Sequence, residues 1–158
     1  MHDTRRHLLL LGMGSVAAFL LPPALGLAQA KKSLVFLDFA SRVALDGHDA
    51  VAYFKTGKSL KGAPEHHLTW NGASWHFSSA ENKAAFEASP HAFAPQYGGY
   101  CAWAVSQGYT AKGDPKYWRI VDGKLYLNYN ASVQKDWEKD IPGRIAKGDK
   151  NWPNVLGK

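Results

Sequence analysis

The chain has 158 residues, of which 46% are hydrophobic and 20% charged. This composition is typical of one globular domain and excludes a disordered chain. The single cysteine excludes both a disulfide framework and a zinc module built from several cysteines. The formal net charge is +6, but the basic residues are interleaved with acidic ones, as in residues 135–140. No basic stripe is formed, so we expect no nucleic-acid partner.

The first thirty residues have the pattern of a secretory signal peptide. Arg5 and Arg6 precede an apolar run over 8–21, and the small-residue site Ala28-Gln29-Ala30 follows. The run is shorter than the roughly 18 residues that a membrane span needs, which disfavours the alternative of a retained anchor. The segment Thr4-Arg5-Arg6-His7-Leu8-Leu9 resembles a twin-arginine signal, with general secretion as the alternative. We therefore predict recognition by the export machinery, cleavage after Ala30, and a periplasmic protein with one domain over 31–158.

The N-terminal part of that domain gives weak local signals. Residues 34–37 are apolar and fit either a short strand or an arm docked on the domain. A turn is expected at 47–49, the apolar run over 50–54 is too short to assign by periodicity, and 55–65 is predicted as a loop.

Two β-hairpins give the clearest local signals. In each, two strands flank a dipeptide, Asn71-Gly72 in the first hairpin and Asp122-Gly123 in the second. Such dipeptides are typical of type I′ turns, which need positive φ at both central residues. The predicted strands are 67–70 and 73–77, then 117–121 and 124–129.

Helices are expected after each hairpin. The segment Ser78-Ser79-Ala80-Glu81 fits a capping box with Ser78 as the N-cap, and Ser89-Pro90 should end that helix. A second helix should begin near Asn130, break at Pro142-Gly143 and continue as a short piece to Lys147. Hairpins and helices together predict an α+β class, with a small antiparallel sheet built from the two hairpins and packed against a few short helices. We detect no internal repeat in the sequence.

The pattern of these elements resembles a known family. The segment 70–86, reading WNGASWHFSSAENKAAF, resembles the core of the YHS domain, in which a hairpin ends on an aromatic-His-Phe strand and leads into a helix. The segments 47–54, 96–102 and 122–129 resemble a recurrent exported form of this domain, so the resemblance covers most of residues 44–154.

The resemblance also implies where a metal would bind. In metal-binding YHS and related domains, cysteines are associated with an early turn, with the position after the aromatic-Phe strand, and with the first helical turn. Here the last two positions hold Ser78 and Asn82, and the early turn offers His48 and Asp49. Serine and asparagine are poor substitutes for thiolates toward a soft metal. The family's usual metal site is therefore absent or rebuilt.

Cys101 is the remaining candidate for a soft-metal ligand. It follows Gly98-Gly99-Tyr100, and it is the only sulfur atom left once the signal peptide is removed. Thiolate with imidazole suits Cu(I), so we predict a copper ion on Cys101 with His48 or His76 as the second ligand. The alternatives for Cys101 are a buried apolar residue, a redox-active or intermolecular thiol, and a nucleophile paired with His48.

Four aromatic residues suggest a different kind of site, because Tyr97, Tyr100, Trp103 and Tyr109 gather around the glycines at 98 and 99. They fit either a small-ligand pocket or a hydrophobic core. No motif of a known enzyme class is present. The sequence thus predicts an exported, non-enzymatic binding protein that handles a transition metal such as copper. A metal-free module that binds a small ligand or a protein is the alternative, and a thiol-dependent enzyme is the third candidate.

Overall fold

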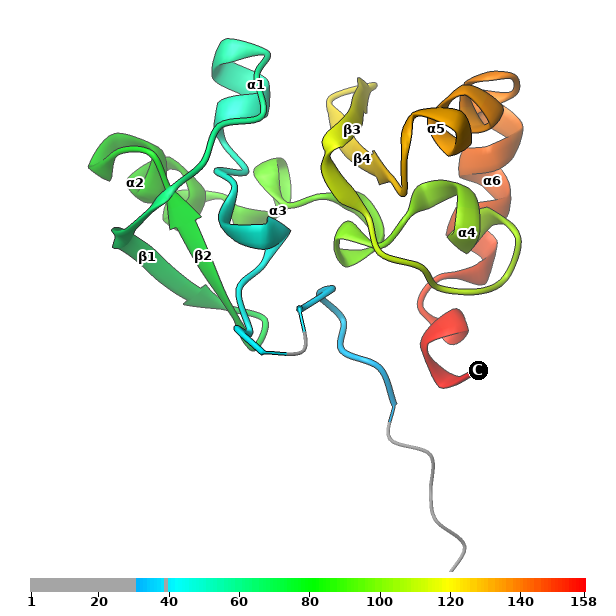
Figure 1. Cartoon of the computed structure of the whole chain (residues 1–158), viewed down its shortest axis with the longest axis horizontal. Helices are drawn as coiled ribbons and strands as arrows, with labels where there is room; N and C mark the ends of the chain where they lie inside the picture. Colours follow the sequence, from blue (N-terminus) through cyan, green and yellow to red (C-terminus); the bar gives the residue numbers. More distant parts are fainter. Residues whose placement is uncertain (1–30, 39) are drawn as a thin grey trace, which may run out of the picture.

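The computed structural model describes residues 31–38 and 40–158, so the predicted signal peptide over 1–30 lies outside the described residues. The class is α+β, as predicted, and each hairpin forms an antiparallel two-stranded sheet of its own. Figure 1 shows one hairpin on each side of the molecule, each with its own helices. Among the described residues, no helix is both long enough and apolar enough to cross a lipid bilayer.

The elements follow one another in two similar series, which we call the first and the second repeat. The first repeat contains η1 (Leu45–Gly47), α1 (Ala52–Thr56), β1 (Ala63–Trp70), β2 (Ala73–Phe77), α2 (Ala80–Ala88) and α3 (Pro90–Phe93). The second repeat contains η2 (Gln96–Gly99), α4 (Ala102–Ser106), β3 (Asp114–Val121), β4 (Lys124–Asn128), α5 (Ala131–Glu138) and α6 (Ile141–Asn151), followed by η3 (Asn154–Gly157).

The two hairpins match each other residue by residue. In the first, Ala63 pairs with Phe77 and the register then shifts so that His67 pairs with His76. In the second, Asp114 pairs with Asn128 and the register shifts in the same way, so that Trp118 pairs with Leu127. Each of these residues lies 51 positions before its counterpart. A β-bulge at the same place in both hairpins indicates one structural unit used twice.

Backbone details outside the hairpins repeat as well. The amide of Asp49 donates to the Leu60 carbonyl at 2.9 Å, and the amide of Cys101 donates to the Ala111 carbonyl at 2.9 Å. Ser89 and Asp140, which precede α3 and α6, have nearly identical dihedral angles, with φ of −152° and −153° and ψ of 67° in both. The sequence-based conclusion that the chain contains no internal repeat is therefore wrong.

The turn prediction is confirmed, and one capping prediction is corrected. Asn71 and Gly72 have φ of 50° and 74°, and Asp122 and Gly123 have φ of 50° and 72°, as type I′ turns require. The cap of α2 is Ser79, whose Oγ accepts a hydrogen bond from the Asn82 amide at 3.1 Å. The sequence predicts Ser78 as the cap, but the Ser78 hydroxyl donates to the Asp49 carboxylate instead.

Several predicted boundaries change. Strands β1 and β3 begin earlier than predicted, at Ala63 instead of 67 and at Asp114 instead of 117. Asn130 caps α5 as expected, accepting from the Val133 amide at 2.9 Å. The segment after it, expected as a short piece to Lys147, is the full helix α6, which contains Pro142 in its first turn and continues to Asn151. A proline in the first turn is tolerated because that amide has no partner within the helix. Residues 34–37 form the docked arm, in which the Phe36 amide donates to the Gly98 carbonyl at 2.9 Å.

Each repeat has its own hydrophobic core, and strand β4 belongs to both. Its side chains alternate between the two faces of the strand, as the pleat requires. Leu125 and Leu127 pack into the core of the first repeat, while Tyr126 packs into the core of the second. This strand therefore joins the two repeats through apolar contacts.

Candidate functional site

Asp49, Ser78 and Asn82 come together in the first repeat. They lie before α1, after β2 and in the first turn of α2, which are the positions that the family resemblance associates with cysteines. Asp49 is fully buried, and the side chains of Ser78 and Asn82 both reach its carboxylate. We call this group the Asp49 cluster.

The Asp49 carboxylate accepts hydrogen bonds on both oxygens. Oδ1 accepts from the amides of Val51 at 2.8 Å and Ala52 at 3.2 Å. Oδ2 accepts from the Ser78 amide at 2.8 Å, from the Ser78 hydroxyl at 2.6 Å and from Asn82 Nδ2 at 2.7 Å. A buried carboxylate with this many donors is stable as an anion. The lone pairs that would face a metal ion are thus occupied by hydrogen bonds.

The charges around the Asp49 cluster agree with that description. Burial of Asp49 opposes ionisation, but hydrogen bonds from Ser78 and Asn82 outweigh it and hold the pKa of Asp49 below its ordinary value. Lys55 Nζ donates to Asn82 Oδ1 at 3.1 Å, which brings a cation to the outer side of the cluster. The cluster ties α1, β2 and α2 together, and its geometry is that of a structural hydrogen-bond network.

The second repeat holds different side chains at the equivalent place. Cys101 corresponds to Asp49, Tyr129 to Ser78 and Val133 to Asn82, and these three line one cavity of about 210 Å³. The other lining residues are Trp103, Ala104, Tyr109 and Ala111. Tyr109 and Tyr129 are each about half exposed, at 47% and 52%. We call this space the Cys101 cavity.

Cys101 itself is buried at the side of that cavity, with 1% of its surface exposed. Burial raises the pKa of its thiol, although the amides of Ala104, Tyr129 and Trp103 act in the opposite direction. Its Sγ lies 3.8 Å from the side-chain oxygen of Asn128. The thiol is therefore protonated at neutral pH, which makes it a weak ligand and a weak nucleophile until it loses its proton.

The two predicted histidine ligands lie in the first repeat, away from the Cys101 cavity. His48 Nδ1 is hydrogen-bonded to the Leu45 carbonyl at 3.0 Å, and burial lowers the pKa of its imidazole. His76 lines an open groove on the first repeat together with Lys61, and burial likewise lowers the pKa of His76. No histidine lines the Cys101 cavity. Over 31–38 and 40–158, no three His, Cys, Asp or Glu side chains gather closely enough to hold a metal ion.

The four aromatic residues singled out in the sequence do not share one pocket. Tyr97 and Tyr100 pack with Trp152 in the core of the second repeat, with ring centroids 5.9 Å from that indole in both cases. Trp103 and Tyr109 pack edge to face, with ring centroids 6.2 Å apart, and both line the Cys101 cavity. Both interpretations thus hold in part. Tyr97 and Tyr100 belong to the core, although Tyr97 also borders a second cleft described next, and Trp103 and Tyr109 line the Cys101 cavity.

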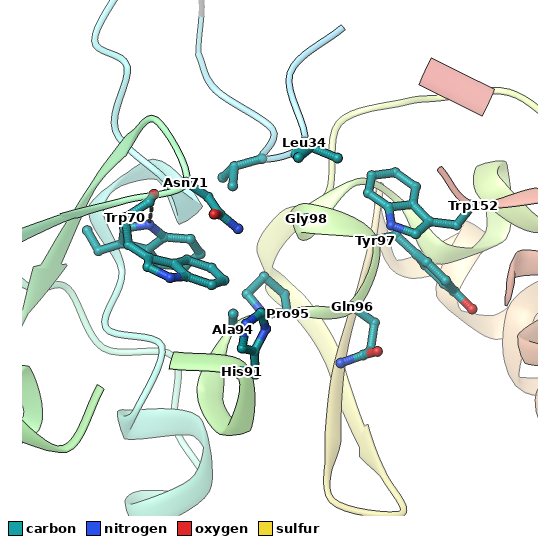
Figure 2. Close-up of a pocket in the computed structure, with 12 residues that line it drawn as sticks. Leu34, Trp70, Asn71, His91, Ala94, Pro95, Gln96, Tyr97, Gly98 and Trp152 are labelled. Carbon is teal, nitrogen blue, oxygen red and sulfur yellow. Dashed lines mark hydrogen bonds between the residues drawn. The ribbon is translucent and has the colours of Figure 1, made fainter. Parts of the chain in front are cut away.

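A separate cleft of about 220 Å³ lies where the two repeats meet. Trp70 and Asn71 come from the first hairpin, Gln96 and Tyr97 from η2, and Trp152 from the segment after α6. Figure 2 shows the Trp70 and Trp152 indoles on opposite sides of this cleft, with the Asn71 side chain beside Trp70 and the Gln96 side chain below Tyr97. We call it the junction cleft.

The junction cleft is aromatic and uncharged. No Asp, Glu, Lys or Arg is among its lining residues, and the polar side chains that face it belong to Asn71, Gln96 and His91. His91 packs edge to face on Trp70, with ring centroids 5.1 Å apart. Aromatic walls with a few neutral hydrogen-bonding groups are typical of small-molecule sites. Sequence reasoning missed this cleft because its residues come from segments up to 118 positions apart, Leu34 to Trp152.

Comparison of the chain with models of known families, with curated proteins and with solved structures found no match.

Proposed function

We propose that the protein is an exported, non-enzymatic binding protein of the YHS type that holds a small uncharged ligand in the junction cleft. The observation that carries this proposal is the lining of the cleft, in which aromatic rings and neutral amides meet without a charged side chain. An ionic ligand would lose its hydration there without gaining a counter-charge. A neutral ring loses little hydration free energy on entering the cleft, and its polar groups can form hydrogen bonds with the side-chain amides of the lining.

The size and lining of the cleft suit a single-ring compound. A flat apolar surface can pack on the indoles of Trp70 and Trp152, as aromatic side chains favour. The side-chain amides of Asn71 and Gln96, which both line the cleft, each carry a donor and an acceptor that a polar ring substituent could use. A neutral nucleobase or a neutral sugar ring combines these features.

This proposal takes the metal-free alternative of the sequence analysis in preference to copper. A copper site on Cys101 would need a second ligand, and neither predicted histidine lines its cavity: His48 is hydrogen-bonded to the Leu45 carbonyl, and His76 lines a different groove. The Asp49 cluster offers oxygen atoms that are already hydrogen-bonded. A thiol-dependent enzyme would need a base beside Cys101, and the cavity lining includes none.

The test is a titration of the protein with matched neutral and charged probes. Calorimetry and tryptophan fluorescence monitor binding during the titration. Uracil is paired with orotate, and glucose with glucuronate. We expect saturable binding of a neutral probe and binding of its charged counterpart at least about tenfold weaker, which corresponds to about 1.4 kcal/mol. Absence of binding by both neutral probes, or equal affinity within both pairs, would contradict the proposal.

Variants locate the binding. Asn71→Gly keeps the positive φ of the turn and removes the amide, and Gln96→Ala removes the second amide. Both substitutions should weaken the binding of the neutral probe, because each removes a hydrogen-bonding group from the cleft. Lys116→Ala, at an exposed position of β3 outside the cleft, is the matched control and should bind as the parent does.

A further inference from the structure

The Cys101 cavity exists because the second repeat lacks the polar partners of the first. In the first repeat, Ser78 and Asn82 fill the space beside Asp49 by hydrogen-bonding to its carboxylate. In the second repeat the equivalent residues are Tyr129 and Val133. Valine has no polar group to reach the thiol, and Tyr129 is half exposed, so the space beside Cys101 is left as a cavity.

The chemistry of this cavity is almost entirely apolar. Its floor and walls come from the side chains of Cys101, Trp103, Ala104, Ala111 and Val133, with Tyr109 and Tyr129 at its rim. None of these groups is charged, because the thiol is buried and protonated. An engineered apolar cavity of about 150 Å³ inside a protein binds benzene, whereas the Cys101 cavity is open to solvent at its rim. The volume of about 210 Å³ is sufficient for one substituted aromatic ring.

The rim explains how such a ligand would be held. The Tyr109 ring packs edge to face on the Trp103 indole, with ring centroids 6.2 Å apart, so the entrance has one aromatic wall. Tyr109 and Tyr129 are two of the three most exposed large hydrophobic side chains in the described part of the chain. A bound ring would cover part of their surface, and burial of apolar area favours binding.

We propose that the Cys101 cavity is a second binding site, distinct from the junction cleft, and that it takes a small uncharged aromatic molecule. The site does not depend on the function proposed above, since the two share no lining residue. Val133 is the residue that decides its chemistry, because the equivalent residue of the first repeat, Asn82, closes the same space by hydrogen bonds.

The experiment titrates the mature protein with toluene and, as a charged counterpart of similar size, benzoate. Binding is followed by calorimetry and by the increase in melting temperature. We expect one site for toluene, and at toluene concentrations near 100 times Kd the folded state gains about 2.7 kcal/mol. Benzoate should bind at least about tenfold more weakly, because the cavity would strip its carboxylate of water.

Two filling variants and a control place the ligand. Val133→Phe and Ala111→Leu enlarge lining side chains from different walls of the cavity, and either should abolish toluene binding while the circular dichroism spectrum stays that of the parent. Lys135→Phe adds the same phenyl ring at an exposed position of α5 and should leave toluene binding unchanged. Val133→Asn introduces the residue of the first repeat and should weaken binding.

Three results would overturn the proposal: no saturable binding of toluene to the parent, equal binding of benzoate, or undiminished binding in the folded filling variants. Gln96→Ala separates the two proposals, because it lies in the junction cleft and should bind toluene as the parent does. Toluene binding lost in Gln96→Ala and retained in Val133→Phe would assign the ligand to the cleft instead.

Discussion

Asp49 and Cys101 occupy equivalent positions in the two repeats, and equivalent amides surround them. The Asp49 carboxylate accepts from the amides of Val51, Ala52 and Ser78. At Cys101 the backbone of Trp103, Ala104 and Tyr129 favours the thiolate and acts against the effect of burial, which raises the pKa of the thiol. The same backbone cradle thus holds an ionised acid in one repeat and a neutral thiol in the other. The side chains beyond the cradle decide which of the two is stable.

The first prediction concerns the stability that Asp49 confers. Asp49→Asn should lower the free energy of unfolding by about 3 kcal/mol, because a neutral amide presents one acceptor where five donors converge. Denaturant unfolding measures this loss. Glu87→Gln, at an exposed position of α2, makes the same chemical change on the surface and should cost less than about 0.5 kcal/mol. Equal effects of the two substitutions would contradict the structural role of the cluster.

The second prediction concerns pH. The pKa of Asp49 is lowered in the folded state, so its contribution to stability is complete above the unfolded value of 3.8. It is lost as the pH falls below 3.8 and through the lower pKa of the folded state. Melting curves between pH 6 and pH 2 should therefore show that the melting temperature falls at acidic pH, and that it falls less in Asp49→Asn than in the parent. A parallel pH profile in that variant would show that other carboxylates cause the loss.

The third prediction concerns the two hairpin turns. Gly72 and Gly123 have positive φ, and a Cβ at either position would meet no atom within 4 Å. Gly72→Val and Gly123→Val should therefore act through backbone strain alone and destabilise by about 1–3 kcal/mol each. Gly157→Ala, at a glycine with equally open surroundings and no positive φ, is the control. Unchanged melting temperatures in both valine variants would refute the assigned turn geometry.

The fourth prediction concerns metal binding. The double variant Tyr129→Cys, Val133→Cys adds two thiols beside Cys101, at the positions where the Asp49 cluster shows that three side chains meet. It should bind Cu(I) or Zn²⁺ one to one and far more tightly than the parent, since several thiolates form a soft-metal site. Competition with a chelator measures the affinities.

Histidine variants complete that metal experiment. His48→Ala and His76→Ala should leave the Cu(I) affinity of the parent unchanged, because no histidine lines the Cys101 cavity. A large loss of Cu(I) affinity in either of them, together with a loss in Cys101→Ser, would restore the original hypothesis of a thiolate–imidazole copper site.

The fifth prediction concerns export. N-terminal sequencing of the periplasmic form should give a start at Lys31, after the Ala28-Gln29-Ala30 site. Replacing Arg5 and Arg6 with lysine should leave the precursor in the cytoplasm if the twin-arginine route is used. A protein that retains Met1 would contradict the predicted cleavage.

Local signals in the sequence were sufficient for the hairpins and for the class of the fold. Asn71-Gly72 and Asp122-Gly123 specify their turns through φ, which depends on neighbouring atoms only. The sequence predicts the cap of α2 one residue early, because Ser78 and Ser79 are equally good caps on their own. Only the tertiary contact of Ser78 with Asp49 distinguishes them.

The repeat and the two cavities required the structure. The repeats share a Lys-Gly pair and a nearby proline at equivalent positions: Lys61-Gly62 matches Lys112-Gly113, and Pro64 matches Pro115. Most other side chains differ between the two repeats. Gly62 and Gly113 are retained because a Cβ at either would collide with atoms of the paired strand or turn. Spacing of glycine and proline was therefore the signal that could have shown the duplication.

Strand β4 limits how independent the two repeats can be. Because Leu125 and Leu127 complete the apolar interior of the other repeat, a fragment that ends before β4 would leave that interior open to water. Neither copy is then an autonomous folding unit, and the pair should melt in a single cooperative transition. The two repeats thus form one folding unit, even though the Asp49 cluster and the Cys101 cavity give them different side-chain chemistry.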